Sequence, residues 1–359
     1  MAKETSPAPA PRPAEKVRNV ALVGHSGAGK TTLAEALLVA TGALVRAGRV
    51  EDGTSCLDTE DVELRQRRSV SLGVATVEHA GHRITLLDTP GAPDFVGELR
   101  AGLRAADAAL FVVSAVNGVD AATVQLWEEC AAVGMPRAVV ISQLDKPRAD
   151  VADAVRACQT LLGDGVFPVH LPDRGPDGAV RGVVSLLDPT AAAGLDDAGE
   201  ADQRRSELIE GIIGESEDEA LMERYLAGDE LVQADLIADL ETAVARGHFH
   251  PVLLAAPLTG VGVPELLELV VAGFPSPLEH GCPPVTRPDG SSAPALSCDG
   301  DGPLVAEVVR RRPTPTSAGS RSCGSSPARC GPTSPSTSPG TAWPTGVTPT
   351  TTWTSGSAP

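Results

Sequence analysis

The residues Gly24–Thr31 have the types and spacing of a loop that binds phosphate groups. They read Gly-His-Ser-Gly-Ala-Gly-Lys-Thr, which matches the pattern G-x-x-x-x-G-K-T. The glycines allow the backbone to curl and to turn its N–H groups toward phosphate oxygens. We expect Lys30 to neutralise phosphate charge and the hydroxyl of Thr31 to bind magnesium. Nucleotide binding is therefore the first chemistry that the sequence predicts.

The flanks of this loop support the same prediction. The apolar run Val20–Val23 before it is typical of a short strand, and residues 33–38 after it follow a helix pattern. A helix N-terminus at this point adds partial positive charge where phosphates would lie. A glycine-rich turn with an incidental lysine is the weaker alternative, because the whole strand–loop–helix context is present. The candidate nucleotide contacts here are Gly24, His25, Ser26, Gly27, Ala28, Gly29, Lys30, Thr31 and Thr32, with His25 in a structural role rather than as a base.

A second candidate segment follows the apolar run 84–87 and reads Asp88-Thr89-Pro90-Gly91. An Asp at a strand end opposite the first loop can hold magnesium through a water. A Gly three residues later can offer its N–H to the γ-phosphate, and hydrolysis would then release the segment that follows. Lys30 and Gly91 are the candidate catalytic residues. A plain turn at a strand end is the alternative.

A third candidate segment, Ser142-Gln143-Leu144-Asp145, follows the apolar run 138–141. A carboxylate at this place can accept hydrogen bonds from two guanine N–H donors that adenine does not offer. Guanine pockets usually read N-K-x-D here, so Ser142 and Gln143 depart from the pattern while Asp145 keeps it. We expect a guanine preference with weaker affinity, with a solvent-facing Asp as the alternative.

The elements that position these segments alternate between strand and helix over 17–150. Expected strands are 20–23, 83–87, 109–113 and 138–141, and expected helices are 33–40, 95–105 and 121–133. This order predicts an α/β domain with a mostly parallel sheet and helices on both faces. The charged stretch 46–71 has little periodicity and is predicted to be a long functional loop.

The pattern changes after the first 150 residues. Strand-like pieces at 166–171 and 180–187 and an acidic helical region at 203–245 predict an inserted α+β subdomain over about 155–248. A strand at 252–255 and a helix at 263–272 then return to the first pattern. We therefore predict a flexible arm at 1–16, a GTP-binding domain over 17–280, and a linker with the first strand of an incomplete β-barrel over 281–309.

Composition sets limits on partners and location. The chain has 359 residues, a formal net charge of −18, and 42% hydrophobic residues. The negative charge disfavours loose binding to nucleic acid, and we expect no sequence-specific nucleic-acid contact. No signal peptide and no membrane-spanning run are found. The seven cysteines form no CxxC pair, which favours a reducing cytoplasm. We expect a monomer.

These segments, in this order, resemble the GTPase domain of elongation factor G, and in particular the elongation factor G-like paralogues of high-GC bacteria. The resemblance runs from about Val17 to Val309 and includes Asp94-Phe95, 115–119 and 275–278. It also covers the insertion, where 219–226 is similar to the extra subdomain of the family. The resemblance implies a ribosome-dependent GTPase that uses GTP, GDP and Mg²⁺, with later domains that move tRNA and mRNA or rescue ribosomes.

Several positions depart from the family. The residue after D-T-P-G is normally a His that positions the attacking water, and here it is Ala92. The family's R-G-I-T-I aligns with 68–72, so the magnesium-binding hydroxyl would be Ser71. The family's Asp in the phosphate loop falls at Gly27. Its late Ser-Ala base contact falls at Ala256-Pro257, where Pro257 has no N–H to donate.

The last fifty residues do not resemble the rest of the chain. From Arg310 onward Pro, Ser, Thr and Gly dominate, and Asp, Glu and Lys are absent. A disordered low-complexity tail is one interpretation. GC-rich back-translation with a two-base shift turns 311–332 into an alternating strand pattern similar to the family's next strands. We therefore favour a frame-shifted, disordered tail over 310–359.

These residues and the family resemblance together predict a cytoplasmic protein that binds GTP and GDP with Mg²⁺ and hydrolyses GTP slowly, and the resemblance implies a link to the ribosome. Translocation is not expected of a chain that lacks the later domains. The alternatives are a nucleotide-dependent ribosome-binding module without meaningful turnover and a non-functional truncated product.

Overall fold

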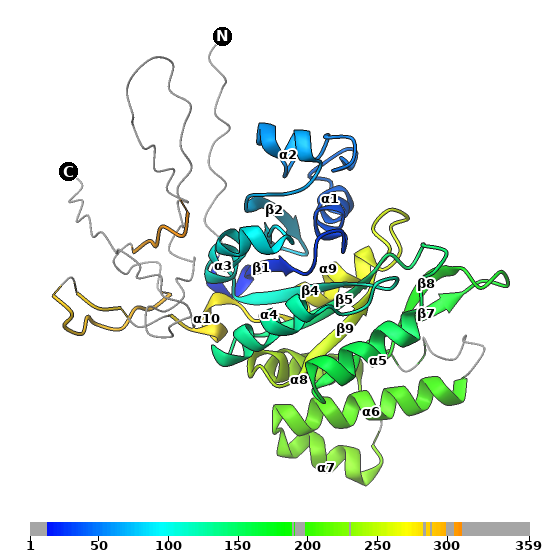
Figure 1. The fold of residues 1–359 in the computed structure, drawn as a ribbon. Helices are drawn as coiled ribbons and strands as arrows, with labels where there is room; N and C mark the ends of the chain where they lie inside the picture. The colour runs from blue at the N-terminus through cyan, green and yellow to red at the C-terminus, as the bar shows by residue number, and fades with distance from the viewer. Residues whose placement is uncertain are drawn as a thin grey trace, which may run out of the picture.

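The computed structural model describes residues 13–188, 190, 198–229, 231–282, 285–287, 289–298 and 305–310, and its centre is a seven-stranded sheet (Figure 1). The strand order across the sheet is β2-β3-β1-β4-β5-β9-β6. Neighbours pair in parallel except β2 and β3, which are antiparallel at one edge. The bounds are β1 Val17–Val23, β2 Gly73–His79, β3 His82–Asp88, β4 Ala108–Ser114, β5 Arg137–Ser142, β6 Val166–Pro168 and β9 His250–Leu254.

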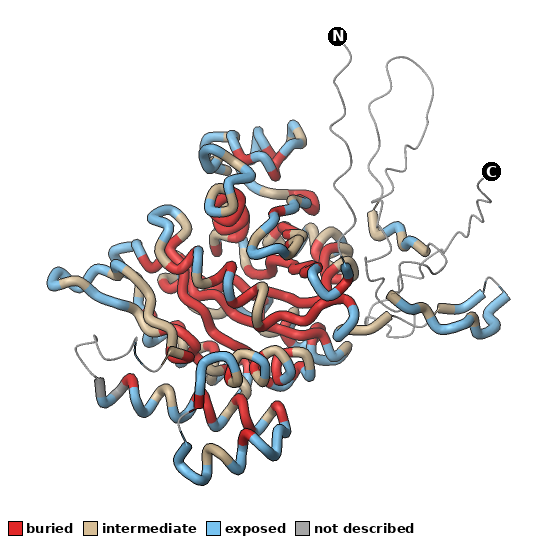
Figure 2. The backbone as a smooth tube through the Cα atoms, turned by 180° about the vertical axis from the view of Figure 1, so that it is seen from behind, coloured by how far each residue is buried: buried red, intermediate tan, exposed pale blue. Residues whose placement is uncertain are grey.

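Helices cover both faces of this sheet, so β1 is buried along its whole length. Its side chains alternate between the faces. Val20 and Leu22 pack in the cluster that includes α1 and α9, while Ala21 and Val23 pack in the cluster that includes α3, α4 and α5. Figure 2 shows the sheet as the buried centre of the domain. The helix bounds are α1 Lys30–Ala40, α3 Val96–Arg104, α4 Ala121–Ala132, α5 Val151–Leu162 and α9 Val263–Gly273.

This architecture confirms the predicted α/β class with a mostly parallel sheet. The strands and helices expected over residues 20–272 are present, each within a few residues of the predicted bounds. The continuous apolar runs in the sequence have a simple cause, since strands buried on both faces need no polar alternation.

The inserted elements lie between β6 and β9. They comprise an antiparallel hairpin and a helical group, in which α6 packs on α8 and α8 packs on α9 (Figure 1). Because β6 pairs with β9 in the main sheet, the extra elements begin later than residue 155. Their bounds are β7 His170–Arg174, β8 Val180–Ser185, α6 Ala198–Ser216, α7 Glu219–Ala227 and α8 Gln233–Ala245.

Strand β2 and helix α5 were not predicted from the sequence, and the structure differs from the prediction in three further segments. The loop predicted over 46–71 contains helix α2, Asp61–Gln66. The end of the predicted arm forms a short turn, η1 Ala14–Lys16, in which Ala14 is buried. Residues 305–310 have irregular backbone where a strand was expected, because a first strand needs a partner to form a ladder. The rest of the arm and the predicted tail after 310 lie outside the described residues.

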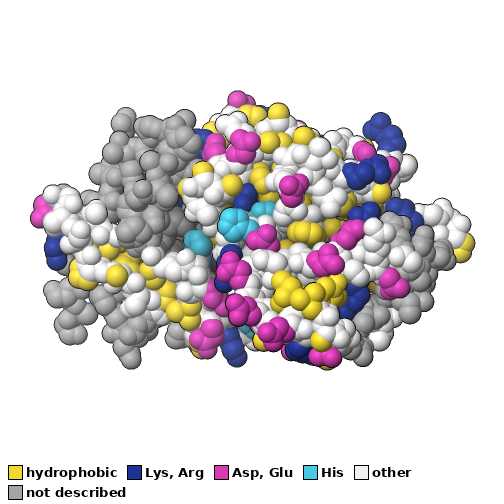
Figure 3. Space-filling view, turned by 90° about the horizontal axis from the view of Figure 1, so that it is seen from below, with side chains coloured by type: hydrophobic (Ala, Val, Ile, Leu, Met, Phe, Trp, Pro, Cys, Tyr) yellow, Lys and Arg dark blue, Asp and Glu magenta, His cyan; other side chains and the backbone are white. Residues whose placement is uncertain are grey.

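Two short helices complete the description, η2 Pro93–Phe95 and α10 Pro277–His280. Among the described ranges, no helix is both long enough and apolar enough to cross a bilayer. On the face of the molecule shown in Figure 3, acidic side chains are spread over much of the surface, in keeping with the negative net charge of the chain.

The packing at Gly24 gives a testable prediction. A Cβ at Gly24 would lie 2.4 Å from the backbone oxygen of Val112 in β4, and the φ of Gly24 is +145°. A Cβ at Gly27, with φ +83°, would have nothing within 4 Å. We expect Gly24→Ala to lower the free energy of unfolding by at least about 2 kcal/mol more than Gly27→Ala, because backbone cannot yield as a side chain can. Urea denaturation measures both values, and equal losses would contradict the prediction.

Candidate functional site

The phosphate loop joins β1 to α1, and glycines shape it. Gly24, Gly27 and Gly29 all have positive φ, with values of 145°, 83° and 97°. L-residues with a side chain rarely adopt such angles, so the backbone at these positions favours glycine. Gly29 is the N-cap of α1, and the helix N-terminus therefore opens into the loop.

Lys30 lies beneath the loop rather than in solvent. Its Nζ donates to the backbone oxygens of Gly24, at 2.8 Å, and His25, at 3.0 Å. Burial lowers the pKa of Lys30 to about 8, against the attraction of Asp88 and Asp120, which raises it. The ammonium group is thus held within the curl of the loop, where phosphate oxygens would be its natural counter-charge.

Thr31 and Asp88 meet at the carboxyl ends of β1 and β3. Asp88 lies opposite Leu22 in the register of these parallel strands. The hydroxyl of Thr31 donates to Asp88 Oδ2 at 2.7 Å. The structure thus brings together two of the residues predicted to hold magnesium.

The surroundings of Asp88 suit a hard cation. Asp88 Oδ1 and Asp58 Oδ2 are both buried without a hydrogen-bond partner. Burial is the largest influence on both groups, and it raises the pKa of Asp58 and the pKa of Asp88, the latter to about 6. Mg²⁺ prefers oxygen ligands and usually keeps several waters and substrate phosphates as well as one or two carboxylates. Within the described part of the chain, no three His, Cys, Asp or Glu side chains gather to hold a metal, so phosphates and hydroxyls would have to complete such a site.

Two serines, Ser69 and Ser71, are candidates for the second hydroxyl that would bind magnesium. Ser69 Oγ lies 3.1 Å from Thr31 Oγ1, while Ser71 Oγ donates to Glu63 Oε1 at 2.9 Å. The alignment of R-G-I-T-I with residues 68–72 selected Ser71, and Ser69 lies two residues before it. In this structure Ser69, which that alignment did not select, is the one beside Thr31.

Gly91 lies directly against the phosphate loop. A Cβ at Gly91 would be 2.4 Å from Lys30 Nζ and 2.6 Å from Ser26 N. The next residue, Ala92, is the N-cap of η2 and presents only a methyl group. The tight approach leaves room for a glycine beside the phosphate loop but for no side chain at position 91.

The other loop residues have less direct roles. Nδ1 of His25 lies 2.8 Å from Ser26 O, which fits a donated N–H, and Nε2 is buried without a partner. Ala28 is buried and Ser26 is exposed. Thr32 is partly exposed in the first turn of α1.

The predicted base pocket is tied to the phosphate loop by side chains. Gln143, with φ 62°, donates from Nε2 to Gly27 O at 2.8 Å and accepts from Ser114 Oγ at 2.8 Å. Ser142 Oγ donates to Ala28 O at 2.6 Å. Asp145 is exposed at the open end of this segment.

Ala256 lies at the carboxyl end of β9, next to this pocket in sheet order. Its N–H donates to Val261 O at 2.8 Å, so the amide is already used within its own turn. The backbone amide of Ala256 therefore has no free N–H to offer a base in this structure.

The buried carboxyl of Asp88 predicts a pH dependence. Because the pKa of Asp88 is raised to about 6, the folded state binds this proton more tightly than the unfolded state. Its contribution to stability is therefore complete below about pH 4 and is lost as the pH rises through about 6. Without nucleotide and magnesium, we expect stability to fall over this window by up to about 3 kcal/mol through this group.

Asp88→Asn should remove that part of the slope, since the amide carries no charge. Asp94→Asn, at an exposed position, serves as the matched control and should keep the slope. Urea denaturation at several pH values measures the effect, and equal slopes in wild type and Asp88→Asn would refute the prediction.

Comparison with known proteins agrees with this geometry. The family model for the elongation factor Tu GTP binding domain matches residues 15–276. The elongation factor G-like proteins of Mycobacterium tuberculosis strains CDC 1551 / Oshkosh and ATCC 25618 / H37Rv are each 51% identical to this chain over 310 residues. The matches cover 83% of this chain and 43% of each relative, so the chain spans less than half the length of these relatives.

A solved structure, that of ttk003000868 from Thermus thermophilus, is also similar. Its TM-score is 0.68 and its sequence identity is 38%, over 75% of this chain and 42% of that chain. The matched family region contains the phosphate loop, the Thr31–Asp88 contact and the segment around Asp145. The chain therefore belongs to the family of elongation factor Tu GTP-binding domains.

Proposed function

We propose that this chain binds GTP and GDP with Mg²⁺ and hydrolyses GTP slowly. The observation that carries the proposal is the series of contacts Asp88–Thr31–Ser69. It brings three side-chain oxygens that suit a hard cation together beside Lys30, at the N-terminus of α1. Magnesium, when bound, would neutralise charge on the β- and γ-phosphate oxygens. Thr31 and Ser69 would hold it directly, and Asp88 would act through a water.

Residues 142–145 support guanine as the base. Asp145 offers an exposed carboxylate at the carboxyl end of β5, and a charged acceptor strengthens hydrogen bonds to N–H donors. Gln143 and Ser142 bind the carbonyls of Gly27 and Ala28. These bonds tie the proposed base pocket to the phosphate loop, without the lysine charge that the usual pattern provides.

Slow hydrolysis follows from the residue after Gly91. A methyl group at Ala92 can neither orient nor polarise a water, and water-positioning groups account for large factors in GTPase rates. His25 does not replace it, because the ring is turned toward its own loop and Nδ1 contacts Ser26 O. Lys30 and the N–H of Gly91 remain to stabilise phosphate charge.

The ribosome is the partner we propose, with a cytoplasmic location. The support is the family of the chain and the printed name of its relatives, elongation factor G-like protein. Ala92 favours a second candidate: a module that docks on ribosomes in its GTP-bound state without turnover. Co-sedimentation with ribosomes and a GTP analogue, combined with negligible phosphate release, would distinguish the second function from the first.

Turnover measurements test the proposed activity. We expect measurable but slow GTP hydrolysis, weak stimulation by ribosomes and no hydrolysis of ATP, because Asp145 selects guanine. Ala92→His should raise the ribosome-stimulated rate by at least about tenfold, because positioned general catalysts contribute about 10²–10⁴-fold. Wild-type turnover as fast as that of an ordinary elongation factor would contradict the proposal.

The role of Ser69 has its own test. We expect Ser69→Ala to lower the affinity for a non-hydrolysable GTP analogue at least about tenfold in Mg²⁺ and little in EDTA, because it removes a metal ligand. Ser71→Ala should have a smaller effect, since that hydroxyl binds Glu63. Fluorescent-nucleotide titration measures both, and a larger loss for Ser71→Ala would return the role to Ser71.

A further inference from the structure

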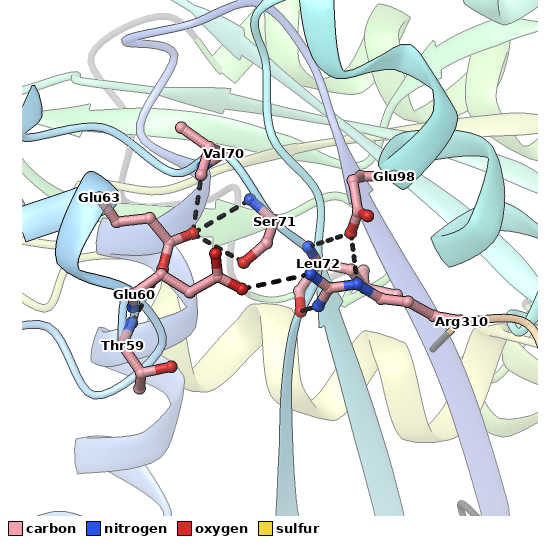
Figure 4. Close-up of polar contacts among 8 residues, drawn as sticks. All are labelled: Thr59, Glu60, Glu63, Val70, Ser71, Leu72, Glu98 and Arg310. Carbon is pink, nitrogen blue, oxygen red and sulfur yellow. Dashed lines mark hydrogen bonds and ion pairs between the residues drawn. The ribbon is translucent and has the colours of Figure 1, made fainter. Parts of the chain in front are cut away.

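Glu63 is a buried carboxylate that the nucleotide site does not explain. It lies on the six-residue helix α2, and only 1% of its surface is exposed. A charge in such a place must be compensated by hydrogen bonds or by other charges. Figure 4 shows the carboxylate of Glu63 among several backbone and hydroxyl donors.

One oxygen of Glu63 caps its own helix. Oε2 accepts from the amides of Thr59 and Glu60, each at 2.9 Å. In the reciprocal bond the backbone amide of Glu63 donates to the Glu60 side chain, and the two together form a capping box at the N-terminus of α2. Helix capping therefore explains only one of the two carboxylate oxygens of Glu63, Oε2.

The other oxygen binds the segment that directly follows Ser69. Oε1 accepts from Val70 N at 3.1 Å, from Ser71 N at 3.0 Å and from Ser71 Oγ at 2.9 Å. Burial alone would raise the pKa of Glu63, but the hydrogen bonds from Glu60, Val70 and Ser71 outweigh it and hold this pKa below its ordinary value. The group is thus an ionised anchor for this segment.

The anchoring continues for one more residue. Leu72 N donates to Glu98 Oε2 at 2.9 Å, and Leu72 O accepts from Arg310 Nη1 at 3.1 Å. Arg310 also lies 2.7 Å from Glu98 and 3.4 Å from Glu60 (Figure 4). Three successive amides, 70 to 72, are therefore held by carboxylates, and Ser69 stands at the end of this fixed stretch.

We propose that Glu63 is a positioning residue for the magnesium site: its carboxylate fixes residues 70 and 71 and thereby keeps the Ser69 hydroxyl beside Thr31. The inference rests on the proposed nucleotide function and adds a residue that touches neither metal nor nucleotide. Outer residues that orient metal ligands commonly change metal affinity by about 10–100-fold when substituted.

Glu63→Gln is an informative variant, because both oxygens of the carboxylate are occupied by donors. A glutamine has one oxygen and one NH₂ group, so either orientation turns an N–H toward at least two N–H donors. Glu63→Asp keeps the charge but shortens the side chain, so it separates positioning from simple charge. Asp61→Asn is the matched control, because Asp61 is an exposed acid on the same helix.

The first experiment measures the affinity for GDP and a GTP analogue in Mg²⁺ and in EDTA. We expect Glu63→Gln and Glu63→Asp to reduce the gain that Mg²⁺ gives to analogue binding by about tenfold. Affinity in EDTA should change less than about twofold, and Asp61→Asn should resemble wild type. The double variant with Ser69→Ala should lose no more than Ser69→Ala alone, since both act through one hydroxyl.

Several outcomes would overturn the inference. Equal losses with and without Mg²⁺, a normal Glu63→Asp, or fully additive effects with Ser69→Ala would show a merely structural or electrostatic role. If wild type itself binds no guanine nucleotide, the proposed function fails instead, and the two failures are therefore distinguishable.

A second measurement does not depend on nucleotide. Hydrogen exchange of the nucleotide-free protein should show protected amides at 70 and 71 in wild type and at least about tenfold faster exchange there in Glu63→Gln. Amides of β1 report whether the variant is folded and should be unchanged. Unchanged protection at 70 and 71 in a folded variant would refute the anchoring.

Discussion

The burial of Asp88 is the constraint on which the rest of the site depends. A fully buried carboxylate is costly unless its charge is matched. Thr31 donates to one oxygen and Lys30 supplies a nearby positive charge, while the second oxygen has no hydrogen-bond partner. The parallel register of β1 and β3 imposes this arrangement, because it sets Asp88 beside the start of the phosphate loop.

Hydrogen bonds to carboxylates also hold the long loop between α1 and β2. Irregular backbone cannot satisfy its own amides, so other groups must do so. Glu35 of α1, which is 1% exposed, accepts from Gly48 N, Ser55 Oγ and Cys56 N. Glu63 and Glu98 take the amides from 70 to 72. Carboxylates, of which Glu35 and Glu63 are buried, thus give this loop a defined path without a regular hydrogen-bond ladder.

Local patterns in the sequence predict part of this arrangement, and contacts between distant elements decide the rest. The phosphate loop, the strands buried on both faces and their helices follow from local patterns, and the α/β class is confirmed. Helix α2 was missed because six residues are too few to show a period, and it is held by the capping box of Glu63. The choice between Ser69 and Ser71 could not be made locally, because it depends on contacts with Thr31 and Glu63 from other elements.

The charge balance bears on the proposed role of magnesium. Its formal net charge of −18 opposes the approach of a polyphosphate. The negative charges of Asp58 and Glu63 help to raise the pKa of Asp88, so these carboxylates lie near Asp88, which itself interacts with Lys30. One ammonium group and the N-terminus of α1 do not balance several phosphate charges and these carboxylates. A divalent cation between the phosphates and these carboxylates would replace their repulsion by attraction to the cation. We therefore expect nucleotide affinity here to depend more on Mg²⁺ than on Lys30 alone.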